Sequence, residues 1–378
     1  MCGRYVVATP PQQLALDFDE DDVRVRANPR GTRPRSQLRP RHEDAAEGMV
    51  IAVDRGRYTC LVESDSREVN AMKARELGRK GVVVGDRVLL VGDLRGGPDS
   101  LARIVRVNPR KHVLRRTADD TDPVERVIVA NADQLVIVTA LADPEPRPRM
   151  IDRCLVAAFE AGLEPLLCLT KADLADPEPL LSAYEPLGVP SIVTRRGGSL
   201  EQLREALAGR VSVLVGHSGV GKSTLVNALV PDADRAIGHV NDVTGRGRHT
   251  STSAVALHLP QYPPSRSGSA DPADPSDTVD ADGQPPVLPG GWVIDTPGVR
   301  SFGLAHVSPD RVIQAFPDLA AVIAECPRGC THADDAPDCA LDEWLAGLEQ
   351  GSAGLVMATA RVDSIRRLLR ALTERSEH

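Results

Sequence analysis

Residues 211–230, VSVLVGHSGVGKSTLVNALV, constrain the fold more than any other stretch of the chain. An apolar run leads into GHSGVGKS, which matches the phosphate-loop pattern GxxxxGK[ST] throughout, and apolar residues at helical spacing follow. In such a loop backbone N–H groups turn toward phosphate oxygens, a lysine reaches the β- and γ-phosphates and a serine ligates Mg²⁺. We therefore predict a nucleotide site made of Gly216, His217, Ser218, Gly219, Val220, Gly221, Lys222, Ser223 and Thr224, with Ser223 as the Mg²⁺ ligand.

The surrounding region, residues 117–305, alternates between predicted strands and helices. DQLVIVTAL (133–141) and EPLLCLT (164–170) are apolar runs of strand length, whereas MIDRCLVAAFEAG (150–162) has apolar residues at helical spacing. Such a series predicts an α/β fold with a mostly parallel, doubly wound sheet. Residues 261–291 are rich in Pro, Ser, Asp and Gly, and we predict a disordered insertion there.

The tetrapeptide Thr170-Lys171-Ala172-Asp173 stands at the end of the apolar run LLCL. A carboxylate such as that of Asp173 can accept both N1–H and N2–H of guanine, groups that adenine does not offer. The stem of Lys171 can pack over the base, and Thr170 can tie this loop to the phosphate loop. A helix cap is the alternative, but only five of the 45 basic residues are lysines and two of them fall in these two motifs. We predict guanine recognition, with the loop 194–198 (TRRGG) as a second base contact.

The sequence WVIDTPG supplies the remaining nucleotide contacts. Asp295, directly after an apolar strand, suits a water-mediated contact to Mg²⁺, and the N–H of Gly298 suits the γ-phosphate. The motifs run in the order TKAD, TRRGG, GHSGVGKS, DTPG, with the guanine-reading element ahead of the phosphate loop. A parallel sheet can still form when the chain termini are moved to another loop, provided that the same strands pair. This order of motifs therefore indicates a circularly permuted GTPase. Because the chain after DTPG leads into the C-terminal region, we expect nucleotide state to move that region.

Two further domains are predicted on either side. Residues 48–116 contain several short alternating strands with Gly at the bends, which predicts a small β-barrel of the oligonucleotide-binding (OB) type, although any small barrel would fit. Residues 306–378 are predicted to be helical around a cluster of three thiols and one imidazole, which suits one tetrahedral, structural Zn²⁺ per chain. The alternative is a group of reduced thiols in a loop. The predicted ligands are Cys326, Cys330, His332 and Cys339.

The N-terminal residues 1–47 combine an acidic run, DFDEDD, with a stretch rich in Arg and Pro. We expect a flexible, disordered arm that is either a solvated tail or an electrostatic contact for a polyanion such as RNA. Residues 1–16 resemble the start of the SRAP family, whose cysteine attacks abasic DNA. That resemblance would make Cys2 a nucleophile, while a fused remnant or a misplaced start codon are the competing explanations.

Composition limits the remaining possibilities. The formal net charge of −8 excludes a globally basic nucleic-acid coat, and seven cysteines in a long chain argue against a disulfide scaffold. The sequence has no apolar run of the roughly 18–20 residues that a membrane helix needs, and it does not open with a secretory signal. We expect a soluble, cytoplasmic monomer with no membrane partner.

Together these features resemble the ribosome small-subunit-dependent GTPase A (RsgA) family over roughly residues 48–370. The stretches ANADQLVIVTALADPEPRPRMIDR (130–153) and GRGRHTSTSA (245–254) add to the resemblance. It implies an OB barrel, a circularly permuted GTPase and a C-terminal zinc domain. It also implies GTP hydrolysis coupled to binding of the 30S subunit and its 16S rRNA late in maturation. Two features depart from the family. The spacing of the zinc ligands differs, because the gap between Cys326 and Cys330 is one residue shorter and the gap between His332 and Cys339 is one residue longer. The insertion 261–291 is additional.

The catalytic prediction depends on a residue that is missing. Many GTPases carry a Gln after DxxG that orients the attacking water, but Val299 and Arg300 follow DTPG here. We therefore expect slow intrinsic hydrolysis and predict His249 as the orienting residue, with an ordinary exposed histidine as the alternative. By resemblance, His249 lies in switch I, where Thr250 or Thr252 would reach Mg²⁺.

Two other function classes remain open at this point. A phosphate-loop kinase or ATPase with a nucleic-acid-binding barrel would turn over ATP, and it would not need the guanine-reading Asp173. A DNA-crosslinking protein would act through Cys2 and would form a covalent adduct with abasic single-stranded DNA.

Overall fold

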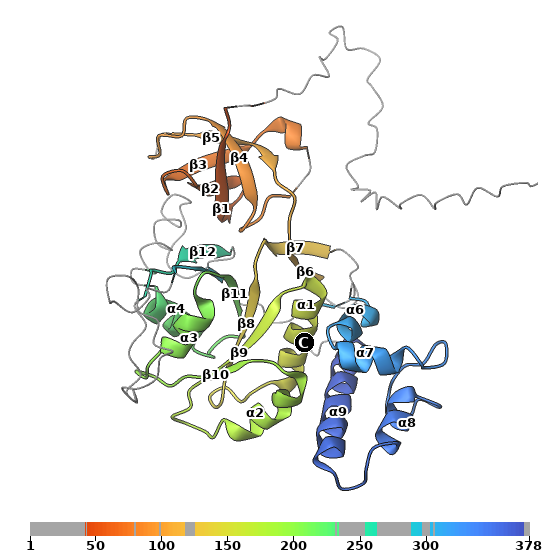
Figure 1. Cartoon of the computed structure of the whole chain (residues 1–378). Helices are drawn as coiled ribbons and strands as arrows, with labels where there is room; N and C mark the ends of the chain where they lie inside the picture. Colours follow the sequence, from red (N-terminus) through yellow and green to blue (C-terminus); the bar gives the residue numbers. More distant parts are fainter. Residues whose placement is uncertain are drawn as a thin grey trace, which may run out of the picture.

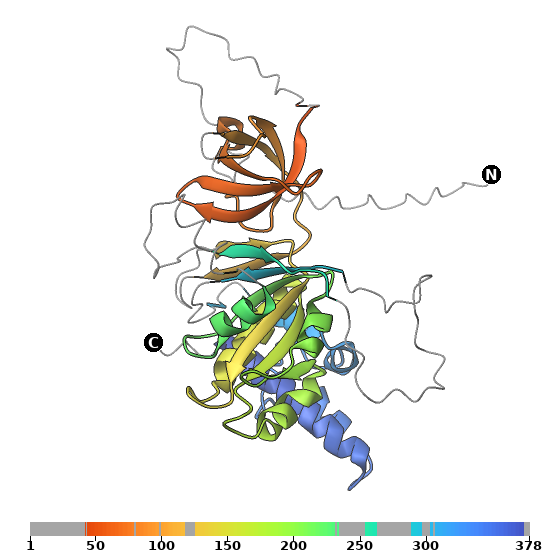
Figure 2. The same cartoon turned by 90° about the vertical axis from the view of Figure 1, so that its left-hand side faces the viewer.

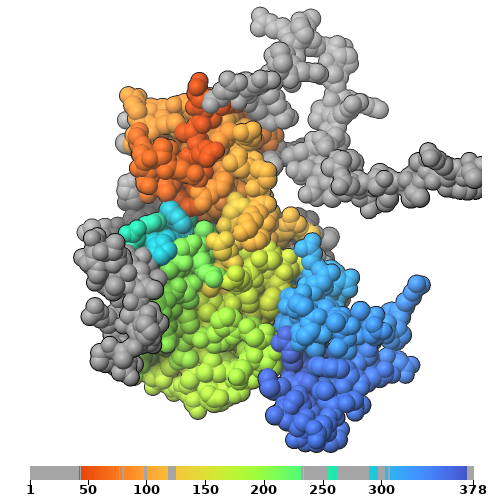
Figure 3. Space-filling model, viewed as in Figure 1, coloured from red at the N-terminus to blue at the C-terminus, as the bar shows by residue number. Residues whose placement is uncertain are grey.

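The computed structural model describes residues 42, 44–78, 81–97, 100–117, 125–230, 233, 254–262, 289–296, 303–304 and 307–373. A β-barrel lies above an α/β domain, and a helical domain stands beside the α/β domain as a separate lobe (Figures 1 and 3). None of the described helices is both long enough and apolar enough to span a bilayer.

The N-terminal barrel has five strands. Strand β1 pairs with both β2 and β4, and β3 pairs with β5 in parallel, so the barrel closes in the order 1-2-3-5-4-1. Alternating residues such as Val50, Leu90 and Ile104 are fully buried inside it. This topology confirms the predicted OB-type barrel. The strands are β1 (Ala46–Asp54), β2 (Arg57–Val62), β3 (Glu68–Lys73), β4 (Arg87–Gly92) and β5 (Ala102–Val107), with a short 3-10 helix η2 (Arg75–Leu77).

The α/β domain is a doubly wound sheet in the order β10-β9-β8-β11-β13-β12, parallel except for β12. Apolar residues on one face pack against α1 and α2, and those on the other face pack against α3 and α4. The strands are β8 (Gln134–Ala140), β9 (Glu164–Thr170), β10 (Ser191–Val193), β11 (Val211–Val215), β12 (Val255–His258) and β13 (Trp292–Asp295). The helices are α1 (Pro148–Ala161), α2 (Glu178–Tyr184) with η3 (Glu185–Leu187), α3 (Glu201–Leu207) and α4 (Lys222–Leu229).

Two connections fix the barrel to the α/β domain (Figure 2). Strand β12 pairs with β1 through Ala52 and Val255, so one continuous sheet runs through both domains. A separate hairpin, β6 (Val113–Thr117) and β7 (Glu125–Ala130), lies between them, and its Ala130 N–H donates to the barrel carbonyl of Val84 at 3.0 Å. The predicted domain boundary between residues 116 and 117 falls inside β6.

The helical domain docks on the α/β domain through its last helix. In α9 (Ala353–Thr373), the Arg367 Nε donates to Asp152 on α1 at 3.1 Å. In return, Arg153 of α1 donates to the carbonyl of Ala371 at 3.0 Å. The helical domain is therefore held by α1 as well as by the chain that follows β13. The other helices are α6 (Pro309–Gln314), α7 (Pro317–Ile323) and α8 (Ala340–Ala346).

Several predictions concern residues outside the described part of the chain. These are most of the arm 1–47, most of the insertion 261–291, and the predicted site residues His249, Thr250 and Gly298.

Candidate functional site

The predicted nucleotide-binding loops converge because they all follow parallel strands. TKAD follows β9, TRRGG follows β10, the phosphate loop follows β11 and Asp295 ends β13. The carboxyl ends of parallel strands meet on one side of a sheet, where ligands bind in doubly wound folds. The loops meet in this way whatever their order along the chain. The structure therefore confirms the circularly permuted arrangement.

The phosphate loop has the backbone that its glycines permit. Gly219 and Gly221 have φ of +85° and +90°, a region that favours glycine. Gly216 passes so close to β8 that an added Cβ would lie 2.5 Å from the carbonyl oxygen of Val138. Helix α4 begins at Lys222, so the loop ends at a helix N-terminus, where backbone N–H groups and the helix dipole favour phosphate.

Lys222 and Asp295, predicted to serve phosphate and Mg²⁺, lie side by side. The Lys222 ammonium forms an ion pair with the Asp295 carboxylate and also donates to the carbonyl of Thr296 at 3.0 Å. The buried Thr296 hydroxyl donates to Leu214 at 2.8 Å and so ties this loop to β11. The predicted Mg²⁺ ligand Ser223, on the first turn of α4, is exposed, as is Thr224. The Nδ1 of His217 is 3.0 Å from the carbonyl oxygen of Ser218.

The TKAD loop, which is predicted to read guanine, is tied to the phosphate loop by Thr170. Its buried hydroxyl donates to the carbonyl of Val220 at 2.6 Å. The TRRGG loop lies next to it, since Ala172 N–H donates to Thr194 at 3.2 Å and the Arg196 N–H donates to the Asp173 carboxylate at 3.4 Å. A threonine therefore makes the tie to the phosphate loop, and Asp173 lies against the TRRGG loop, the second loop predicted to contact the base.

One wall of this site was missed by the sequence analysis. The loop between β8 and α1 brings the carbonyl of Asp143 against the Lys171 ammonium, and the two form a hydrogen bond. The same loop places Pro144 next to Gly219, with its Cδ 3.5 Å from where a Cβ would lie. Both Asp143 and Lys171 have positive φ. The only local sign of this loop in the sequence is the proline-rich DPEPRP after a strand end, which indicates a loop but not what the loop contacts.

Thr170→Val is expected to weaken GTP binding roughly five- to tenfold, because it removes one buried hydrogen bond worth about 1 kcal/mol and leaves the Val220 carbonyl unpaired. The measurement is the equilibrium dissociation constant for a fluorescent GTP analogue. Thr139→Val, the same change at a buried position on the neighbouring strand β8, is the control. Equal affinities of Thr170→Val and wild-type protein would show that the tie is not needed.

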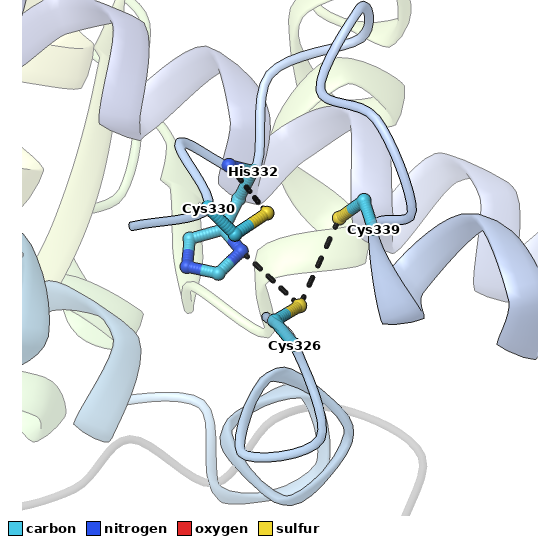
Figure 4. A group of neighbouring side chains, drawn as sticks. All are labelled: Cys326, Cys330, His332 and Cys339. Atoms are coloured by element: carbon cyan, nitrogen blue, oxygen red, sulfur yellow. Dashed lines mark hydrogen bonds between the residues drawn. The ribbon is translucent and has the colours of Figure 1, made fainter. Parts of the chain in front are cut away.

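The helical domain carries the predicted metal site in the segment between α7 and α8 (Figure 4). The ligand atoms of Cys326, Cys330, His332 and Cys339 all lie within 4.8 Å of one another. The Cys326 Sγ lies 3.5 Å from the His332 Nδ1 and 4.0 Å from the Cys339 Sγ. Burial lowers the pKa of His332, and the nearby Arg366 adds to this effect, which favours the neutral imidazole that a metal ligand must be.

The two distances from the Cys326 Sγ are close to those around a tetrahedral zinc ion. Bonds of about 2.3 Å to sulfur and about 2.0 Å to nitrogen place neighbouring ligand atoms about 3.5–3.8 Å apart in a tetrahedron. The donor set of three thiols and one imidazole is also one that zinc prefers. By contrast, Cys60, Cys154 and Cys168 are buried among apolar residues, and burial raises the pKa of each thiol to about 12. They are unsuited to reaction or metal binding.

Comparison with known proteins gives matches across the GTPase region. Residues 107–263 match the model of the RsgA GTPase family, and residues 211–335 match that of the 50S ribosome-binding GTPase family. A protein of Pseudomonas aeruginosa named small ribosomal subunit biogenesis GTPase RsgA is 38% identical over 322 residues, which are 83% of this chain and 82% of the relative. A protein of the same name from Pseudomonas syringae is 36% identical over 328 residues, which are 82% and 83% of the two chains.

Two solved structures share the fold. YjeQ from Thermotoga maritima has a TM-score of 0.57 and 24% identity, covering 88% of this chain and all of that one. YloQ, described as a circularly permuted GTPase, has a TM-score of 0.54 and 20% identity, covering 89% of this chain and 98% of that one. The phosphate loop, the TKAD loop beside it and the extent of the match to the Pseudomonas proteins lead to one conclusion: the chain is a circularly permuted GTPase that belongs to the RsgA family.

Proposed function

We propose that this GTPase binds the small (30S) ribosomal subunit and acts late in its maturation, hydrolysing GTP to GDP and phosphate at a rate that the subunit stimulates. The observation that carries the nucleotide part is the bond from Thr170 to Val220, which sets the guanine-reading loop against the phosphate loop. The ribosomal part is supported by the name of the relatives, small ribosomal subunit biogenesis GTPase RsgA. We further propose that the protein is a cytoplasmic monomer.

The proposed ligands of the site follow from its donors. The phosphate loop and Lys222 hold the phosphates of GTP, Asp173 accepts from guanine, and Ser223 ligates Mg²⁺ with Asp295 acting through water. The exposed hydroxyl of Ser223 supports the Mg²⁺ assignment, as does the carboxylate of Asp295 beside Lys222. One structural Zn²⁺ binds the Cys₃His cluster, which is supported by four donor atoms that all lie within 4.8 Å of one another.

The proposed catalysis needs help from the subunit. Val299 follows DTPG, and an aliphatic side chain cannot orient the attacking water as a glutamine does. We assign that task to His249 in the segment RGRHTSTS, with Thr250 as a Mg²⁺ ligand and the N–H of Gly298 on the γ-phosphate. In this proposal the ribosomal subunit orders the segment that carries His249.

The test of the proposed function is GTP hydrolysis by the purified chain with and without 30S subunits. We expect slow hydrolysis alone, strong stimulation by 30S, and no turnover of ATP.

His249→Ala should remove most of the stimulated rate and leave GTP binding unchanged. An unstimulated rate would reject the ribosomal role, and turnover of ATP would favour a general phosphate-loop ATPase. Wild-type hydrolysis by His249→Ala in the presence of 30S would reject the assigned role of that histidine.

We also propose that the barrel contacts 16S rRNA through the outer face of β2, β3 and β5. Arg57, Met72 and Arg103 are register partners on these strands, so their side chains form one outward row. Met72 is 45% exposed, and neither arginine forms an ion pair among the described residues. Two guanidinium groups beside an exposed apolar side chain can contact phosphates and pack on an unpaired base. The overall charge of −8 would otherwise repel RNA.

Replacing both arginines, Arg57→Glu with Arg103→Glu, should lower affinity for 16S rRNA at least tenfold and reduce the salt dependence of binding by about two phosphate contacts. Affinity would be measured by filter binding across a salt series. Arg210→Glu, a charge reversal at an exposed side chain of the α/β domain, is the control. If the double variant binds as the control does, the RNA contact lies elsewhere.

A further inference from the structure

Arg366 is a buried charge whose partners are all in the metal-binding part of the helical domain. Its side chain is only 7% exposed, although it lies on the arginine-rich helix α9. The Nη2 donates to both carboxylate oxygens of Asp342, at 2.9 and 2.8 Å, and the Nε donates to the backbone carbonyl of His332 at 3.0 Å. A second acid, Asp334, lies 3.7 Å from the Nε.

These partners belong to two separate arms of the Cys₃His cluster. His332 supplies the imidazole, and its own carbonyl accepts from Arg366. Asp342 lies in the first turn of α8, the helix that begins directly after Cys339. The guanidinium therefore spans the gap between the arm that carries His332 and the arm that carries Cys339.

The charge of the site explains why an arginine suits this position. Three thiolates around Zn²⁺ carry a net charge of −1, and the carboxylates of Asp334 and Asp342 add to it nearby. A guanidinium stays protonated when buried, and its planar set of donors can bond to a carboxylate and a carbonyl at the same time. Lysine offers a point charge without that fork, so it cannot hold both arms equally well.

We propose that Arg366 is a positioning residue of the metal site, which holds the His332 and Cys339 arms at the spacing that binds the ion and balances the negative charge of the loaded cluster. The inference rests on the proposed binding of zinc. Outer partners of this kind commonly change metal affinity by about 10- to 100-fold when they are replaced. The helix that carries Arg366 supplies none of the ligands, so sequence spacing around the cysteines gives no indication of its role.

The experiment measures zinc affinity of the full chain by competition with a chromogenic chelator. Arg366→Met should weaken zinc binding about 10- to 100-fold, and Arg366→Lys should recover part of the loss. Arg367→Met is the matched control, because this neighbouring guanidinium contacts Asp152 and the Ala183 carbonyl of the α/β domain instead. Its zinc affinity should stay within about threefold of wild type. A Co²⁺-loaded sample provides a second measurement, since an altered ligand arrangement shifts the thiolate-to-cobalt absorption bands of Arg366→Met but not of Arg367→Met.

The outcomes separate this inference from the zinc assignment. If the wild-type chain binds no zinc, the zinc assignment itself fails. If the wild type binds zinc and both Arg366 variants bind it equally tightly with unchanged cobalt spectra, only the role of Arg366 is rejected. If Arg367→Met loses as much affinity as Arg366→Met, the effect comes from loosening α9, and the proposed role is again rejected. Should Arg366→Met prove too unstable to purify, wild-type behaviour of Arg366→Lys decides against the proposal.

Discussion

Asp173→Asn is expected to lower the affinity for GTP roughly 100- to 1,000-fold and to raise the affinity for xanthosine triphosphate. The carboxylate of Asp173 is the group that we propose to accept two N–H bonds from guanine, and charge-assisted bonds of this type are stronger than neutral ones. An asparagine presents one acceptor and one donor, which matches the C2 carbonyl of xanthine instead of the amino group of guanine. Affinities for GTP, xanthosine triphosphate and ATP would be measured on the same preparation.

The control for this change is Asp176→Asn, three residues further along. That carboxylate accepts a hydrogen bond from the N–H of Glu178 at 3.0 Å, at the start of α2, instead of one from the TRRGG loop. The preference for GTP should therefore survive in Asp176→Asn. An Asp173→Asn variant that still prefers GTP over xanthosine triphosphate would mean that guanine is read by other groups, and the loop after β10 would then be the first place to look.

Cys330→Ser is expected to remove the bound zinc and unfold the loop between α7 and α8. Binding of structural zinc contributes about 10 kcal/mol or more, which is comparable to the whole stability of a small domain. Zinc per chain would be measured by elemental analysis, and folding by the change in tryptophan fluorescence, to which Trp344 contributes from its half-buried position in α8 next to this loop. Incubation of the wild-type chain with a strong chelator should give the same change.

The matched control is Cys60→Ser, at a cysteine buried in the barrel far from the cluster in sequence. It should keep a full equivalent of zinc and the wild-type tryptophan signal. Undiminished zinc in Cys330→Ser would reject the assigned ligand set. A lost signal in both variants would point to general destabilisation.

Features encoded locally in the chain were predictable from the sequence. The phosphate loop needs its glycines and Lys222 within eight residues, the cysteines of the metal cluster are close in sequence, and the barrel strands show alternating burial. The hairpin of β6 and β7 was assigned partly to the barrel, because an alternating pattern shows that a strand has one buried face but does not show which sheet it joins.

Contacts between residues distant in sequence could not be predicted. The hydrogen bond between Lys171 and the Asp143 carbonyl depends on how the loop after β8 folds back, and a backbone carbonyl leaves no signature in the sequence. The docking of α9 on α1 joins residues more than 200 positions apart, as in the bond between Arg367 and Asp152. The arginines of α9 resemble those of any exposed basic helix until their partners are known.

The pairing of β1 with β12 also determines where the molecule can meet other chains. Open sheet edges invite pairing with foreign strands, and proteins avoid this by covering or shortening them. In the α/β sheet, β12 would be such an edge, and the barrel covers part of it through Ala52 and Val255. The opposite edge is β10, which has only three residues and leads into Arg195 and Arg196. The barrel therefore covers part of one edge of the GTPase sheet, and the other edge is short, so little of either edge is open to a foreign strand.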